Sequence, residues 1–134
     1  MTAPTVLVIE DDPASRELVV YLLQAAGMRV LPAGDGTQGL AVGLAEDPDI
    51  ILCDMRMPGL SGCEVVQGLH ASPGWRRVPV VAVTANSMSS DRQKAIDCGF
   101  DDHLAKPIDP ERFVAQVQAY LDAAAPRAPA GPDR

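Results

Sequence analysis

One apolar run constrains the fold of this chain more than any other feature. Residues 49–54 read Asp-Ile-Ile-Leu-Cys-Asp, and Met-Arg-Met-Pro-Gly follows at once. An unbroken apolar segment of this length, closed by a carboxylate and a Pro-Gly breaker, is typical of a strand buried on both faces of a parallel sheet. Ligands bind such sheets beyond the carboxyl ends of the strands. Asp54 is therefore the leading candidate for a reactive acid, although aspartate at this position can also simply stabilise a turn.

Predicted strands and helices alternate along the rest of the chain. Short apolar runs predict strands at 5–9, 28–31, 78–84 and 101–105, in addition to 49–54. Helical spacing, Asp-Pro starts and Gly or Pro-Gly stops predict helices at 12–27, 36–44, 61–72, 86–99 and 109–121. Parallel neighbours need crossover connections, so this alternation predicts a doubly wound α/β sandwich. The flavodoxin-like (βα)5 strand order 2-1-3-4-5 is the most economical choice.

Length and composition favour a single cytoplasmic domain. We expect a domain over residues 1–122 and a flexible Ala/Pro-rich tail over 123–134. No apolar run is long enough for a bilayer, and no segment has the pattern of a signal peptide. The net charge of -7 disfavours binding to nucleic acid or to an anionic membrane.

The three cysteines show no metal or redox motif. Cys53, Cys63 and Cys98 form no C-x-x-C pair and lie near no histidine in the sequence. We expect all three to be free, partly buried thiols in a reducing compartment.

Polar groups follow four of the predicted strands and should meet at one edge of the sheet. Glu10 and Asp11 follow the first strand, Asp54 ends the third, Thr84 ends the fourth and Lys106 follows the fifth. Three neighbouring carboxylates repel one another unless a cation compensates, and oxygen-only ligands suit Mg²⁺. A lysine and a hydroxyl at the same edge suit a phosphoryl group. This constellation predicts phosphoryl transfer to Asp54 as nucleophile, with Mg²⁺ as cofactor.

These residues resemble the receiver domain of bacterial two-component response regulators, over about residues 5–122. The matching motifs are Glu10-Asp11-Asp12, Asp54 with Met57-Pro58 and Gly62, Thr84-Ala85, and Lys106-Pro107. Any one of these motifs alone is a weak signal, but all of them in this order are highly specific.

The resemblance implies a role for each position of the site. Asp54 would accept a phosphoryl group from a histidine kinase or a histidine phosphotransfer protein. Asp11 would bind Mg²⁺ directly and Glu10 largely through water, with the backbone carbonyl of Arg56 as a further ligand. Thr84 and Lys106 would contact the phosphoryl oxygens, and the Lys106-Pro107 bond would be cis.

One position departs from the family pattern. The family usually has Tyr or Phe three residues before the lysine, as a side chain that swings inward on phosphorylation, whereas this chain has His103. A histidine is smaller and can be charged, so its burial would depend on pH. His103 can also be a solvated strand residue with no role in switching. The predicted helix at 86–99 has the thinnest apolar stripe, which consists of Met88, Ala95, Ile96 and Cys98, so we expect it to shift most easily. Output should therefore leave through this fourth helix, the fifth strand and the fifth helix, at residues 88–97, His103 and the outer face of 111–120.

The sequence is compatible with more than one function. A stand-alone receiver would signal by phosphorylation-dependent protein binding, as a monomer or as a phosphorylation-dependent homodimer. The chain can also be a receiver module from a longer hybrid kinase or regulator. A phosphatase of the haloacid dehalogenase type needs a second acid two residues after the nucleophile, where this chain has Arg56. An FMN-binding flavodoxin would not place three acids beside its phosphate. We therefore expect no turnover of an external substrate beyond autodephosphorylation.

Overall fold

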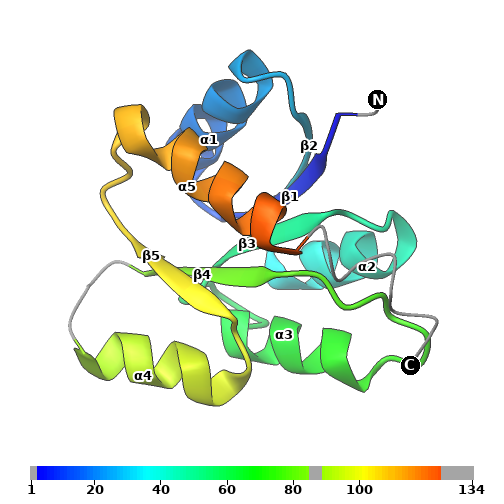
Figure 1. Cartoon of the computed structure of the whole chain (residues 1–134). Helices are drawn as coiled ribbons and strands as arrows, with labels where there is room; N and C mark the ends of the chain where they lie inside the picture. The colour runs from blue at the N-terminus through cyan, green and yellow to red at the C-terminus, as the bar shows by residue number, and fades with distance from the viewer. Residues whose placement is uncertain (1–2, 85–88, 125–134) are drawn as a thin grey trace.

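The predicted doubly wound sandwich is confirmed. The computed structural model describes residues 3–84 and 89–124 of the chain. Within them, five parallel strands form one sheet in the order β2-β1-β3-β4-β5, with helices on both faces (Figure 1). The strands are β1 Thr5–Ile9, β2 Arg29–Ala33, β3 Ile50–Asp54, β4 Val80–Thr84 and β5 Asp102–Ala105, and the helices are α1 Pro13–Ala25, α2 Gly36–Ala45, α3 Gly62–Ala71, α4 Ser89–Cys98 and α5 Pro110–Ala124.

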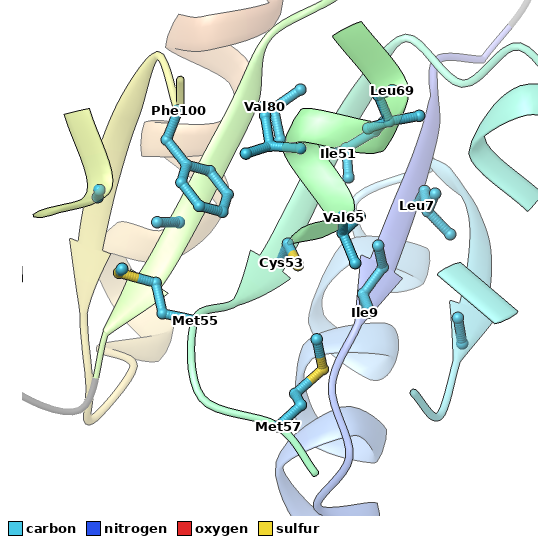
Figure 2. Packing of buried hydrophobic residues seen from close by; sticks show 14 of the residues in the cluster. Leu7, Ile9, Ile51, Cys53, Met55, Met57, Val65, Leu69, Val80 and Phe100 are labelled. Atoms are coloured by element: carbon cyan, nitrogen blue, oxygen red, sulfur yellow. The ribbon is translucent and has the colours of Figure 1, made fainter. Parts of the chain in front are cut away.

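Two apolar layers sandwich the sheet, because alternate residues of each central strand point to opposite faces. On one face α1 and α5 pack against Val6, Val8, Ile50 and Leu52. On the other face α2, α3 and α4 contribute to the layer around Leu7, Ile9, Ile51 and Cys53. Figure 2 shows Val65 and Leu69 of α3 above these strand residues, with Met55, Met57 and Phe100 in the same layer. Burial of both faces explains the unbroken apolar runs of β1, β3 and β4.

Two helix starts form as their sequences predict. The Asp12 side chain accepts a hydrogen bond from the Ser15 backbone N–H at the start of α1. Ser61 and Glu64 form a complete capping box at the start of α3. Because the cap fixes the N-terminus of α3, it also fixes the end of the loop that leaves β3.

Some predicted boundaries were wrong. β2 runs from Arg29 to Ala33 rather than ending at residue 31, and it includes Pro32. It lies at the edge of the sheet, where a residue without an N–H is tolerated. β4 begins at Val80 rather than at residue 78. α5 continues to Ala124, so the first two residues of the predicted tail are helical.

The predicted fourth helix is confirmed in part. α4 spans Ser89–Cys98, while residues 86–88 of the predicted helix, and Ala85 of the Thr84-Ala85 motif, lie outside the described residues. Ala95 is fully buried, as its helical spacing predicts. The same spacing assigns Ile96 to the core face, but Ile96 is 44% exposed, so that prediction was wrong. No helix within 3–84 and 89–124 combines the length and apolarity that a membrane crossing needs.

Candidate functional site

The strand register brings the predicted carboxylates together. Ile9 of β1 lies beside Cys53 of β3, so the next residues, Glu10 and Asp54, are neighbours on the same face of the sheet. Each of Glu10, Asp11 and Asp54 offers a carboxylate oxygen within 4.8 Å of the other two. Glu10 and Asp54 are buried, and Asp11 is half-buried. A cluster of this kind can hold a metal ion, because oxygen ligands converge with a net negative charge.

Lys106 lies between two of these acids. Its ammonium is 2.9 Å from Glu10 Oε1 and 3.3 Å from Asp54 Oδ2. Burial lowers the pKa of Lys106, but the hydrogen bond to Glu10 and the charges of Asp54 and Glu10 outweigh it, so the pKa rises above its ordinary value. The Lys106-Pro107 bond is cis, and the Lys106 N–H donates to the Thr84 carbonyl at 2.7 Å. Lys106 therefore offsets one of the three carboxylate charges.

Further backbone contacts fix the acidic loop after β1. The Asp12 N–H donates to Glu10 Oε2 at 3.1 Å, and Arg16 Nη1 donates to the Glu10 carbonyl at 2.8 Å. The Arg16 contact ties α1 to the loop, and sequence reasoning missed it because an arginine early in an amphipathic helix is unremarkable. The Glu10 side chain is held on both carboxylate oxygens, by Lys106 and by Asp12.

The loop after β3 holds the Asp54 carboxylate in place. Asp54 Oδ1 accepts a hydrogen bond from the Arg56 N–H at 3.2 Å, so Asp54 does stabilise its turn, as the simpler interpretation suggested. Its other oxygen faces Lys106. The Gly62 N–H donates to the Met55 carbonyl at 3.1 Å. A Cβ at Gly62 would lie 2.6 Å from the Asp54 carbonyl oxygen, so only glycine allows α3 this close to Asp54.

Thr84 lines a cavity that the loop after Asp54 also borders. Its hydroxyl is buried and has no hydrogen-bond partner among residues 3–84 and 89–124. Val83, the preceding residue, lies beside Asp54 in the register of β3 and β4. The cavity has a volume of about 570 Å³, and its lining comes from the loop after β3, the first turn of α3, β4 and α4: Met55, Arg56, Met57, Pro58, Ser61, Cys63, Thr84 and Lys94. Lys94 could not be predicted as a lining residue, because it belongs to none of the recognised motifs.

His103 lies outside the charged cluster. β5 places it beside Ala82, two residues before Thr84. Its side chain is 19% exposed, and Nδ1 lies 3.6 Å from Asp102 Oδ1 without a hydrogen bond. His103 is therefore mostly covered rather than solvated.

Tyr120 of α5 makes a polar contact that sequence reasoning missed. Its hydroxyl donates to Asp102 Oδ2 at 2.9 Å and joins α5 to β5. Burial, then the hydrogen bond and the charge of Asp102, raise the pKa of Tyr120. Helical spacing from Phe113 and Val117 predicts Tyr120 on the apolar face of α5, where its ring lies, but spacing alone does not locate a partner for its hydroxyl.

The expectation of three free cysteines was wrong for two of them. Cys63 of α3 and Cys98 of α4 form a disulfide with a Cα–Cα distance of 5.3 Å. Cys53 is free, as expected, and it is buried. Burial raises the pKa of its thiol, and the negative charges of Asp54 and Glu10 raise it further. The two cysteines are 35 residues apart in the sequence and belong to different helices, so local spacing could not reveal the pairing.

Comparisons with known proteins agree with this geometry. The model of the response regulator receiver domain matches residues 6–118. The transcriptional regulator RpaA of Synechocystis is 38% identical over 88% of this chain, and an uncharacterised 14.6 kDa protein of Leptolyngbya boryana is 34% identical over 92%. The matched regions are 49% of RpaA and 94% of the Leptolyngbya protein, so the chain spans about half the length of the first relative.

A solved receiver-domain structure has the same fold. The receiver domain of the sensor histidine kinase PA1611 from Pseudomonas aeruginosa is 30% identical, with a TM-score of 0.82 over 90% of this chain and 99% of that one. That structure is described with a magnesium ion in its active-site cleft. Fold, strand-end residues and matched family agree, and the chain belongs to the response regulator receiver domains of two-component signalling.

Proposed function

We propose that Asp54 is the phosphoacceptor of this receiver and that Lys106 and Thr84 hold the phosphoryl group. The observation that carries the proposal is the Lys106 ammonium between Glu10 and Asp54, beside the half-buried Asp11. An Asp54 carboxylate oxygen attacks the phosphorus of a phosphohistidine. The P–N bond breaks, its electron pair stays on the imidazole nitrogen of the donor, and a P–O bond forms on Asp54.

The three acids would hold Mg²⁺. Glu10, Asp11 and Asp54 supply converging carboxylate oxygens, and the Arg56 carbonyl would be a further ligand. When bound, Mg²⁺ would neutralise negative charge on the phosphoryl group. The magnesium described for the PA1611 receiver supports this choice of ion.

Thr84 and His103 would transmit the change. The buried Thr84 hydroxyl lacks a partner in the described part of the chain, and Thr84 lines the same cavity as the loop after Asp54, so a phosphoryl oxygen would give the hydroxyl an acceptor. Movement of Thr84 toward that oxygen would leave room along β4 and β5 for His103 to turn inward. α4, with one fully buried side chain among its described residues 92–98, would shift with it.

The chain would be a signalling domain that acts through protein partners in the cytoplasm. The donor would be a histidine kinase or a histidine phosphotransfer protein, and the output would be phosphorylation-dependent binding of a protein through α4, β5 and α5, by a monomer or a phosphorylation-dependent homodimer. The acidic chain itself would bind no nucleic acid or membrane. It would turn over no external substrate beyond losing its own phosphoryl group.

A second arrangement is a receiver module within a longer regulator or hybrid kinase. Two of the similar proteins favour this arrangement: a DNA-binding regulator of about twice this length and the receiver domain of a sensor kinase. The Leptolyngbya protein, matched over 94% of its length, favours the stand-alone form.

Amide chemical-shift mapping with beryllofluoride and Mg²⁺ tests the proposed route. Beryllofluoride mimics an acyl phosphate on an aspartate. We expect perturbations at Asp54, Thr84 and His103 and along α4 and α5, and their loss in an Asp54→Asn variant. Perturbations confined to the loop after β3 would contradict output through α4, β5 and α5.

A further inference from the structure

We propose that the Cys63–Cys98 disulfide is a redox-controlled tether that holds α4 against α3 and opposes the response of α4 to phosphorylation. The part that concerns phosphorylation rests on the function proposed above. The disulfide joins the first turn of α3 to the last residue of α4. It therefore connects the helix packed on the phosphoacceptor loop to the helix expected to move.

One end of the tether lies against the site. Cys63 directly follows Gly62, whose Cα lies so close to the loop that a Cβ would come within 2.6 Å of the Asp54 carbonyl oxygen and 2.8 Å of Met55 Cα. Cys63 also lines the cavity that Thr84 borders. A constraint on Cys63 is thus a constraint on backbone that contacts the phosphoacceptor.

The other end holds a helix with few buried side chains. Among residues 92–98, Ala95 is fully buried, Cys98 is half-buried and the remaining side chains are exposed. Alanine removes little apolar surface from water, so the noncovalent attachment of this part of α4 is weak. The disulfide at Cys98 and the buried Phe100, two residues beyond the helix, therefore hold the C-terminal end of α4 in place.

Both sulfurs belong to half-buried residues, within reach of small thiols, whereas Cys53 is buried. A glutathione-class thiolate attacks one sulfur, forms a mixed disulfide and releases the other cysteine as a thiolate. A second thiol then displaces the first cysteine. In total, two small thiols are oxidised to one disulfide, and two hydrogen atoms reach Cys63 and Cys98. In a reducing compartment, disulfides are usually transient and redox-sensing.

Linkage makes the effect reciprocal. If the tether favours the unphosphorylated position of α4, occupancy of Asp54 must favour the dithiol by the same factor. Coupling between sites in proteins is typically about 5- to 150-fold. We expect beryllofluoride to shift the thiol–disulfide equilibrium by at least about fivefold toward the dithiol.

A glutathione titration of the wild-type chain tests both the existence of the tether and its coupling to the phosphoacceptor site. Glutathione itself forms the reduced state, so no substitution is needed for it. The protein is equilibrated at graded ratios of reduced to oxidised glutathione, with Mg²⁺ and with or without beryllofluoride, then acid-quenched and alkylated. Intact mass and peptide mapping give the disulfide fraction. Cys63 and Cys98 should become alkylated together, whereas Cys53 should react only after unfolding. A Cys98→Ser variant should show no Cys63–Cys98 disulfide, and because Cys98 does not line the cavity, its beryllofluoride affinity should match that of the reduced wild type.

The outcomes separate the inference from the proposed function, because beryllofluoride occupancy of Asp54 is measured independently by amide shifts. Absence of the Cys63–Cys98 disulfide at every glutathione ratio would refute the tether. A disulfide equilibrium unmoved by beryllofluoride that is shown to occupy Asp54 would refute the coupling and leave the proposed function intact. Failure of beryllofluoride to reach Asp54 in either redox state would refute the proposed function and the coupling, while the titration would still decide whether the tether exists.

Discussion

Replacement of Lys106 by methionine isolates the electrostatics of the site. The ammonium lies 2.9 Å from Glu10 and 3.3 Å from Asp54, whose side chains are 7% and 9% exposed. Methionine keeps most of the apolar stem of lysine but removes its charge. The two carboxylates then lose a shared positive partner, so the folded state should lose stability in metal-free buffer.

The exposure of Lys106 sets the magnitude. Removing one partner of a buried ion pair costs about 3–5 kcal/mol, whereas exposed pairs contribute about 0–1 kcal/mol. The Lys106 side chain is 26% exposed, so water screens part of the interaction, and we expect a loss of about 2 kcal/mol. Mg²⁺ should recover much of this loss, because a divalent cation relieves the repulsion that the variant leaves uncompensated and binds only the folded state.

Urea denaturation in EDTA and in Mg²⁺, followed by the fluorescence of Trp75, measures both effects. The matched control is Lys94→Met, which removes an exposed lysine that makes neither contact. The control should stay within about 0.5 kcal/mol of the wild type. Equal stability of Lys106→Met and the wild type in EDTA, or a smaller Mg²⁺ stabilisation in the variant than in the wild type, would refute the proposed charge coupling.

Three further substitutions test other contacts. Asp11→Ala should abolish the rise in melting temperature that Mg²⁺ produces in the wild type, and an unchanged rise would place the ion elsewhere. Tyr120→Phe should cost about 1 kcal/mol by removing the hydrogen bond to Asp102. Because folding raises the pKa of Tyr120, this stabilisation is present below the ordinary tyrosine pKa of 10.0 and is lost as the pH rises through the folded-state pKa. The difference in phenolate absorbance between the wild type and the variant reports the ionisation of Tyr120, and it should appear only above pH 10. A difference that appears below pH 10 would contradict the contact. Gly62→Ala should lower the free energy of unfolding in urea by about 1–3 kcal/mol, because the added Cβ would overlap the backbone of the loop. The amide NMR resonance of Asp54 should also broaden or shift. An unchanged stability would contradict this packing.

The sheet and the acidic cluster were predictable because each depends on local pattern. Buried strands on a two-sided parallel sheet must be apolar throughout, so β1, β3 and β4 were visible in the sequence as continuous runs. Once the strand order is fixed, Glu10 and Asp54 must be neighbours, since each directly follows or ends an adjacent strand. Pro32 obscured the end of β2, because a proline usually ends a strand and only the edge position makes it acceptable here.

The missed features depend on tertiary contacts between distant segments. Cys63 and Cys98 meet only because α3 and α4 cover the same face of the sheet. No sequence motif around either cysteine indicates the pairing. The hydrogen bond between Tyr120 and Asp102 likewise requires α5 to return over the last strand. Ile96 was assigned to the core by helical spacing, but the described part of α4 contributes Ala95 and the half-buried Cys98 to that layer and leaves Ile96 exposed.

Intact-mass measurement after incubation with acetyl phosphate and Mg²⁺ tests the central proposal most directly. The wild type should gain one phosphoryl group, and omission of Mg²⁺ should slow the gain strongly. Asp12→Asn, which changes an exposed acid beside the cluster, should behave like the wild type. Asp54→Asn should gain no phosphoryl group, because its amide cannot form the acyl phosphate. Phosphorylation of Asp54→Asn at the wild-type rate would contradict the assignment of Asp54 as the phosphoacceptor.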